Sequence, residues 1–305
     1  MSLADVQSAN VVGYNNISLR SGRYMTGSNF DKITKAGMRL TDLRPTGYED
    51  ITYWSTGKGN GKFNDIVTIT LLSYQGKALR EWKWLASYNK DTSTWNEGYW
   101  YDAADTSKTP IVPGSDADHE FEVGEGLWVN VDPNAYSKPS PKPAADKYKL
   151  VNSGQAMLDS QTIPLRSGRK GIIAPLSRAV RLTEIKPTGY EDITYWSTGK
   201  GNGKFNDIVT ITLLTYQGKA LKEWKWLASY NKDTSTWNSG YWYDVADTSK
   251  TPIEPGTEAD YQFDLGEGLW VNVDPNAYSK PSPKPAADKY LLSFPGLDED
   301  NRVTE

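Results

Sequence analysis

Cysteine is absent from the 305 residues, and histidine occurs once, at His119. The missing cysteines exclude disulfides, thiolate metal sites and cysteine nucleophiles, and a single histidine excludes a His-rich metal cage. No apolar run approaches the roughly 18 residues of a membrane-spanning helix. The net charge of −4 offers no broad positive surface to nucleic acid or to an anionic membrane. We therefore expect no metal, no cofactor, no nucleic-acid partner and no membrane span.

Tryptophan and tyrosine dominate the aromatic residues, with 12 tryptophans and 19 tyrosines beside 6 phenylalanines. The chain also holds 26 glycines and 17 prolines, and its mean hydropathy is −0.64. It is thus rich in aromatic residues and turns without being strongly apolar. This composition is typical of small β domains in which Trp and Tyr form a half-buried core.

A tandem duplication organises the chain. Residues 45–148 recur as 187–290 at a constant offset of 142, with 11 differences over 104 residues and no gaps. Upstream, the motif at 19–23 recurs at 165–169, at an offset of 146. A repeat of this length is a whole domain rather than a solenoid unit. We predict two tandem near-identical domains at 5–148 and 149–290, followed by a tail at 291–305 that we interpret as the stump of a further repeat.

A proline-rich segment ends each copy, at 132–146 and again at 274–288. Alternating prolines favour an extended, semi-rigid spacer between domains. The alternative is that the segment forms the outer strand and flap of each domain. The sequence leaves both interpretations open.

Short β-branched and aromatic segments separated by turns predict the strands. Residues 65–74 form a β-branched run with partial alternation, as in a central strand. Residues 78–88 fit a strand or a short helix, and the alternation Trp-Lys-Trp favours the strand. Residues 92–95 and 99–102 are expected to pair as a tight hairpin. Strands at about ten-residue spacing predict an all-β fold, with a β-sandwich or β-barrel-like domain in each copy.

The acidic residues do not define a catalytic or metal site. Asp116, Asp118 and Glu120 alternate as calcium ligands can, but the EF-hand glycine and terminal glutamate are missing, so we expect a solvated loop. His119 is replaced by Tyr261 in the second copy, which argues against a catalytic histidine. No pair of carboxylates stands out for glycoside hydrolysis. We therefore expect no enzyme activity, with a glycan-active enzyme as the least favoured alternative.

Aromatic side chains are the candidate contact residues. Neighbours in a β-strand point to opposite faces, so one member of each aromatic pair is turned outward. A flat exposed ring beside amide and carboxylate groups can stack on a sugar, and it can equally serve a protein contact. A third interpretation places the tryptophans in the core. The candidates for a glycan or protein contact are Tyr53, Trp54, Tyr99, Trp100, Tyr101, Tyr195, Trp196, Tyr241, Trp242 and Tyr243.

A small basic cluster surrounds the Ser-Gly turn of each copy. We interpret it as a solvated turn, with an interdomain or intersubunit salt-bridge site as the alternative. Its members are Arg20, Arg23, Arg166, Arg169 and Lys170.

The N-terminal residues suggest export. Ser2 and Ala4 fit the small-residue positions before a signal-peptide cleavage site, so we expect a secreted protein whose signal has been removed. Residues 5–14 resemble the mature start of a loose group of uncharacterised secreted proteins from verrucomicrobial and lentisphaeral bacteria. Residues 99–102 and 124–129 also resemble the recurring pattern of that group, a Trp hairpin followed by Gly-x-Gly-aromatic. The resemblance implies no reaction and no functional residues.

These observations predict a non-catalytic structural protein on the outside of a bacterial cell. Near-identical domains offer identical interfaces, which favours self-association into a surface layer, filament or adhesive stalk. The alternative is a pair of carbohydrate-binding modules that gain avidity from two equal sites. The expected partners are further copies of the chain or a polysaccharide.

Overall fold

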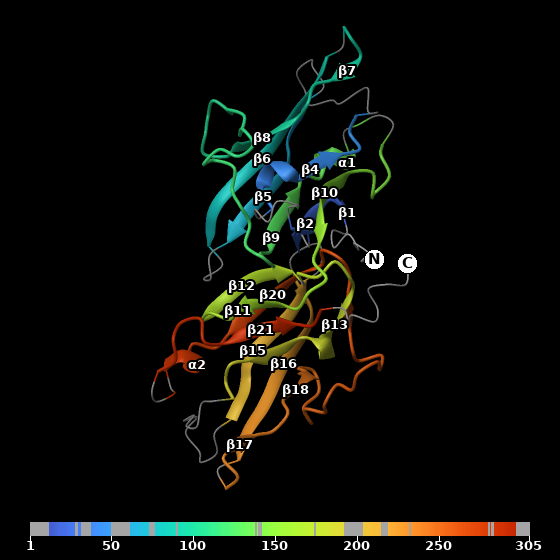
Figure 1. The fold of residues 1–305 in the computed structure, drawn as a ribbon. Helices are drawn as coiled ribbons and strands as arrows, with labels where there is room; N and C mark the ends of the chain where they lie inside the picture. The colour runs from blue at the N-terminus through green and yellow to red at the C-terminus, as the bar shows by residue number, and fades with distance from the viewer. Residues whose placement is uncertain are drawn as a thin grey trace, which may run out of the picture.

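Figure 1 shows the computed structural model of the chain as two β modules that lie end to end. The structure describes residues 12–27, 30–31, 38–49, 62–72, 77–89, 91–137, 139, 142–173, 175–191, 204–214, 219–231, 233–279, 281 and 284–296.

Each module is built around one large antiparallel sheet. In the first module the strand order is β2 (Gly22–Thr26), β9 (Leu127–Val131), β5 (Lys62–Leu72) and β6 (Ala78–Asn89), and both β7 (Thr94–Trp95) and β8 (Tyr99–Asp102) pair with β6. The second module repeats this order with β12 (Gly168–Ile173), β20 (Gly268–Val273), β15 (Lys204–Leu214), β16 (Ala220–Asn231), β17 (Thr236–Trp237) and β18 (Tyr241–Asp244).

A smaller sheet accompanies the large one in each module. The first has β1 (Val12–Ser18), β10 (Lys149–Ala156), β3 (Phe30–Asp31) and β4 (Arg44–Thr46), and the second has β11 (Gln161–Pro164), β21 (Leu291–Phe294) and β14 (Lys186–Thr188). The remaining elements are the 3-10 turns η1 (Leu40–Asp42) and η2 (Leu182–Glu184), the short pair β13 (Val180–Arg181) and β19 (Gln262–Phe263), and the one-turn helices α1 (Asn134–Ser137) and α2 (Asn276–Ser279). Among the described residues, no helix has the length and apolar character needed to cross a membrane.

Each module has its own hydrophobic core. Trp82, Trp84 and Ala86 of β6 alternate with less buried residues and point into the first core, as the period of a half-buried strand requires. The predicted choice of strand over helix for this segment is therefore confirmed. The first core runs from Leu19 to Leu150 and the second from Ile163 to Phe294, without shared members. The predicted all-β class and the two similar sandwich-like sheets are confirmed.

Strand pairing assigns the segment after each repeat to the preceding module. β10 opens the second copy of the sequence, yet it pairs with β1, β3 and β4 of the first module. β21, at the same place after the second copy, pairs with β11 and β14. Residues 291–294, which lie in the tail, thus complete the sheet of the second module. From here on, the first module means the elements β1 to β10 and the second module those from β11 to β21.

Two local expectations are wrong. The residues around β7 and β8 do not form a hairpin with each other, because both strands pair along the same edge of β6. The proline-rich segment is not a spacer over its described part; it packs on its own module, as the flap alternative predicts, but as a short helix rather than an outer strand. It contains α1, whose Ala135 is buried in the first core and whose carbonyl oxygen accepts a hydrogen bond of 2.7 Å from the Tyr148 hydroxyl. The segment is therefore docked on its own module.

Candidate functional site

The structure places four of the predicted contact residues inside the modules. Trp100 is 1% exposed and donates its indole N–H to the carbonyl oxygen of Leu43 at 2.7 Å. Trp242 makes the same bond in the second module, at 2.6 Å to Ile185. Both tryptophans lie in the cores of their modules. Trp84 on β6 packs edge-on against Trp100, and Trp226 on β16 packs edge-on against Trp242.

Tyr101 and Tyr243 point away from Trp100 and Trp242, as strand alternation predicts, but they are buried as well. The ammonium of Lys108 lies 5.1 Å from the centre of the Tyr101 ring and covers it, and Lys250 covers Tyr243 in the same way. Neither ring offers a face to a ligand. Tyr99 and Tyr241 are half-buried. Tyr53, Trp54, Tyr195 and Trp196 lie outside the described residues.

An aromatic groove lies instead at the far end of β6, where the chain turns into β7. Tyr88 and Trp95 face each other across this strand pair, with ring centres 5.5 Å apart. The edge of the buried Tyr48 ring meets Trp95 from the core, with centres 5.1 Å apart. Trp95 is therefore fixed from below and from one side while part of it remains exposed. The sequence analysis did not select either residue.

Polar side chains surround the two rings. The groove has a volume of about 560 Å³ and is lined by Ser87, Tyr88, Asn89, Asp91, Thr94, Trp95 and Asn96. Its lining therefore combines a flat apolar surface with two amides, a carboxylate and hydroxyl groups. Side chains of these types recognise the ring face and the hydroxyls of a sugar.

The turn that carries the groove is held by its own hydrogen bonds. The side-chain oxygen of Asn89 accepts from the backbone N–H of Asp91 at 2.9 Å, and that of Asn96 accepts from Ser87 at 2.6 Å. Ser93 adopts a φ of 54° at the tip, a left-handed conformation that the short turn requires. The groove is therefore preorganised, which reduces the entropic cost of binding.

The second module carries identical residues at the positions that correspond to this lining. Tyr230 and Trp237 face each other with ring centres 5.4 Å apart, and Asn231 and Asn238 make the same turn hydrogen bonds. Tyr230 is buried in this copy, whereas Tyr88 is half-buried. β7 and β17, which carry the two grooves, lie at opposite ends of the molecule (Figure 1). A signal in the sequence could have found them: a polar Asn-Lys-Asp-Thr-Ser-Thr turn with an aromatic residue at each end.

The acidic loop has a structural role. Asp118 is buried, and its carboxylate accepts hydrogen bonds from the backbone and hydroxyl of Thr41, at 3.0 and 2.8 Å, and from the backbone of Gly114 at 2.8 Å. The expectation of a solvated loop is wrong here, because this carboxylate ties η1 to the loop. Asp260 makes the same three contacts in the second module. Among the described residues, no group of three or more metal-ligating side chains is close enough to hold an ion.

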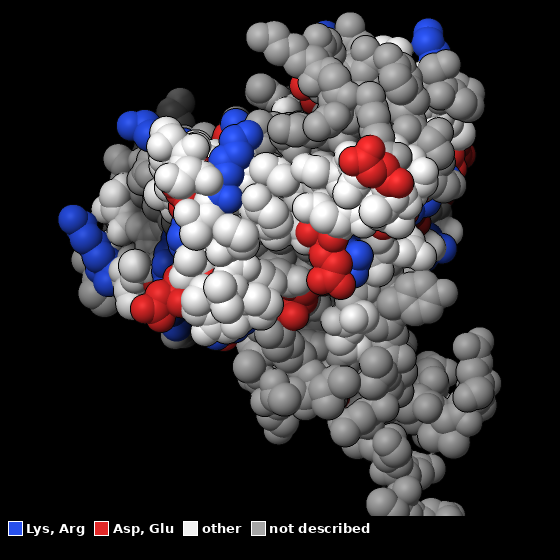
Figure 2. Space-filling view, turned by 90° about the horizontal axis from the view of Figure 1, so that it is seen from above, with Lys and Arg blue, Asp and Glu red and all other residues white. Residues whose placement is uncertain are grey.

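Charges are spread over the surface of the first module. In the space-filling view of Figure 2, acidic and basic side chains are scattered among uncharged residues, and in places the two signs adjoin. His119, the single histidine, packs against the Trp82 ring with centres 5.3 Å apart, and its Nε2 lies 3.3 Å from the Glu125 carboxylate. Tyr261 takes this place in the second module and donates its hydroxyl to Glu267 at 3.0 Å.

The two modules meet through the same face. Trp128 and Trp270, which correspond in the repeat, lie with ring centres 6.1 Å apart. Gly126 packs on Gly171 of the other module, and Gly268, the counterpart of Gly126, packs on Met25, the counterpart of Gly171. When residue i meets residue j and their counterparts meet in turn, the interface is isologous. The modules are therefore joined face to face by an approximate two-fold axis rather than head to tail.

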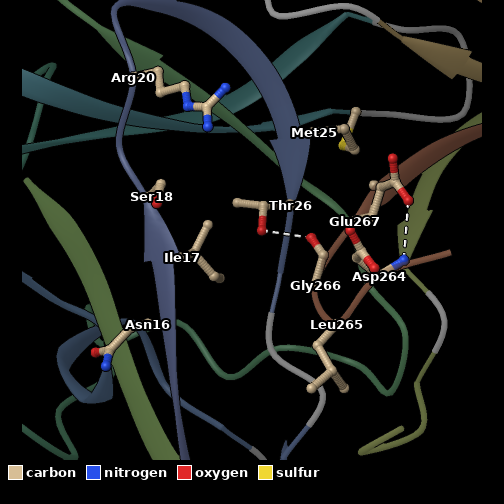
Figure 3. A pocket seen from close by; sticks show the side chains of 11 residues that line it. Asn16, Ile17, Ser18, Arg20, Met25, Thr26, Asp264, Leu265, Gly266 and Glu267 are labelled. Atoms are coloured by element: carbon tan, nitrogen blue, oxygen red, sulfur yellow. Dashed lines mark hydrogen bonds between the residues drawn. The ribbon is translucent and has the colours of Figure 1, made fainter. Parts of the chain in front are cut away.

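A cavity of about 270 Å³ opens at this junction (Figure 3). One wall comes from β1, β2 and their link in the first module, and the other from the loop before β20 in the second. The lining residues are Asn16, Ile17, Ser18, Arg20, Met25, Thr26, Asp264, Leu265, Gly266, Glu267 and Gly268. Burial raises the pKa of the Glu267 carboxyl above its ordinary value, since desolvation outweighs the hydrogen bonds that Asp264 and Tyr261 donate to it.

Comparison of the chain with family models, with curated proteins and with solved structures gives no match. The class of the protein therefore follows from its own fold: a duplicated all-β protein with the same aromatic pair beside a polar turn in each module.

Proposed function

We propose that this chain is a non-catalytic, secreted polysaccharide-binding protein that holds one glycan strand in the groove at each end. The observation that carries the proposal is the repeated groove, in which a partly exposed tryptophan, Trp95 or Trp237, lies among amide, carboxylate and hydroxyl groups. The lining of the groove at Trp95 contains a single carboxylate, Asp91, whereas glycoside hydrolysis ordinarily takes two. This supports binding over cleavage.

Affinity electrophoresis through gels that contain a soluble β-1,4-glucan, β-1,3-glucan, xylan or galactomannan tests the proposal. We expect at least one of these polysaccharides to retard the wild-type chain. The double variant Trp95→Ala with Trp237→Ala should weaken binding by roughly 30-fold, because a central tryptophan contributes about 2 kcal/mol or more at a contact. Since Trp95 also packs on Tyr48, the milder pair Asp91→Ala with Asp233→Ala tests the groove without touching the core.

A matched control comes from residues outside the groove. Leu79 and Leu221 are 66% and 65% exposed, so Leu79→Ala with Leu221→Ala should leave binding unchanged. The proposal is overturned if no polysaccharide retards the wild-type chain, or if the groove variants bind as well as this control.

Placement of the grooves at opposite ends predicts cross-linking rather than chelation of one strand (Figure 1). A wild-type chain should raise the turbidity or viscosity of the polysaccharide that it binds. Trp95→Ala alone should still bind through the second module but should not cross-link, because it retains one functional groove.

Self-association into a surface structure is the second candidate. Leu79 and Leu221 favour it, since two corresponding, strongly exposed leucines offer apolar contacts on both modules. Sedimentation at increasing concentration should then show multimers that Leu79→Ser with Leu221→Ser abolishes. A wild-type chain that stays monomeric throughout contradicts this candidate.

A further inference from the structure

The approximate two-fold axis at the module junction creates two corresponding sites, which differ in one respect: one is closed and the other is open. On the closed side, the backbone N–H of Gly126 donates to Gly171 at 3.0 Å, and that of Ile173 donates to Gly124 at 3.1 Å. The Ile163 side chain lies directly over Gly124 and fills the remaining space.

Lys170 supplies a cation to the closed site. Its ammonium lies 3.2 Å from the Glu122 carboxylate of the other module, and its side chain is only 13% exposed. Lys170 thus forms the interdomain salt bridge that the sequence left as an alternative. The pair shows what this face accepts: an ammonium group, largely shielded from water, against a carboxylate at the turn before the β9 strand.

On the open side, the same positions carry different residues. Tyr24 corresponds to Lys170, Asp264 to Glu122, and Met25 to Gly171. The Met25 side chain packs on Gly171 and Gly268, and a hydrogen bond of 2.7 Å from the Thr26 hydroxyl to the Gly266 carbonyl oxygen joins the two modules here. The modules are in close contact at Met25, as they are at Gly171, and the cavity opens beside this contact with Met25 in its lining.

The walls of the cavity differ in charge. Asp264 and Glu267 come from the second module, and Figure 3 shows Arg20 on the opposite side, above Ser18. The charged residues of the lining therefore sum to −1, and Asn16, Ser18 and Thr26 add amide and hydroxyl groups. A volume of about 270 Å³ lies just below the range of roughly 300–1,000 Å³ for drug-sized ligands, which suits a molecule of monosaccharide size.

We propose that this cavity binds a small amino sugar with a free, protonated amino group. Its ammonium pairs with the Asp264 carboxylate, as the ammonium of Lys170 pairs with Glu122 on the closed side. Its hydroxyls bind the polar groups of the β1 wall, from Asn16 to Arg20. The ammonium group of the ligand thereby provides on the open side the positive charge that Lys170 provides on the closed side. This proposal is independent of the terminal grooves.

Isothermal titration of the full chain with glucosamine tests the inference, with N-acetylglucosamine and glucose as matched ligands that lack the charge. We expect glucosamine to bind severalfold more tightly than the two neutral sugars, since Asp264 is exposed and an ion pair with an exposed carboxylate contributes only modestly. Asp264→Asn should weaken glucosamine binding to a similar extent. Equal binding of the three sugars, or no binding of glucosamine, overturns the proposal.

Two further variants separate the cavity from general effects on the junction. Met25→Gly removes a side chain that lines the cavity and should weaken glucosamine binding. Glu122→Gln breaks the ion pair on the closed side and should leave binding unchanged. If Asp264→Asn folds, as judged by its thermal unfolding, and binds glucosamine as the wild type does, the assigned position of the ammonium is wrong.

Discussion

Replacement of Asn152 tests how the first core is built. Asn152 lies on β10, is 1% exposed, and neither its side-chain nitrogen nor its oxygen has a hydrogen-bond partner among the described residues. Its counterpart at the same place on β21 is Phe294, which is equally buried in the second core. The fold therefore accepts a large apolar side chain at this position. The unpaired amide of Asn152 lowers the free energy of unfolding of the first module, and the second module has no such group here.

The magnitude follows from three terms. A buried polar group without a partner costs about 1–3 kcal/mol, and burial of a leucine side chain contributes roughly 1.5–3 kcal/mol. Imperfect packing of the new side chain offsets about 1–3 kcal/mol of this gain. We expect Asn152→Leu to stabilise the first module by about 2 kcal/mol. For a module of this size, that corresponds to a rise in Tm of roughly 4–8 °C.

Differential scanning calorimetry measures this change, with Phe294→Asn as the reciprocal variant. The reciprocal change should destabilise the second module by about 3 kcal/mol or more, because it removes a buried aromatic ring and leaves an amide unpaired. A lower Tm for Asn152→Leu would refute the reasoning, since it would show that the amide forms hydrogen bonds that are worth more than the apolar contacts.

Three more substitutions test single contacts. Asp118→Ala removes the acceptor for three hydrogen bonds and should cost about 2–3 kcal/mol in urea unfolding, whereas the exposed Asp116→Ala should stay within about 0.5 kcal/mol of the wild type. Gly98→Ala drives a methyl group into the Trp84 indole and should cost about 1–3 kcal/mol, visible as a lower Tm. Because the pKa of Glu267 is raised in the folded state, the stability it contributes is present at acid pH and is lost as the pH rises through that pKa. The Tm of Glu267→Gln relative to the wild type should therefore rise as the pH increases above the ordinary pKa of a glutamate, and a constant difference would contradict the burial of this carboxyl.

The sequence predicts the parts of the fold that depend on local pattern. The repeat is visible directly, and the alternation of Trp82 and Trp84 indicates a strand because both rings point to one face. Pairing between distant strands leaves no such local mark. The β6 strand is long enough for β7 and β8 to share its edge, so the short turn between them does not become a hairpin. The transfer of β10 to the first module is invisible for the same reason.

Candidate contact residues were harder to predict, because alternation says which neighbours face opposite ways but not what covers the outer face. Tyr101 points outward and is still buried, since Lys108 lies over it. Trp95 lies in a segment whose alternation indicates a strand less clearly than the segment around Tyr101. Its position beside a polar turn nevertheless leaves it partly exposed. Met25, which lines the junction cavity, lies where the two copies match least, so the repeat alone does not predict its contacts.

The way in which the two modules meet at the junction explains why the proposed binding sites lie at opposite ends of the chain. Identical units that meet head to tail can propagate, whereas units that meet through the same face close after two copies. The contacts of Gly126 with Gly171 and of Gly268 with Met25 show that the two modules meet through the same face. β7 and β17 lie at the ends of the two modules that are far from this junction (Figure 1). The two aromatic grooves therefore point outward at opposite ends of one chain, and bivalence follows from the way the copies pair rather than from any further assembly.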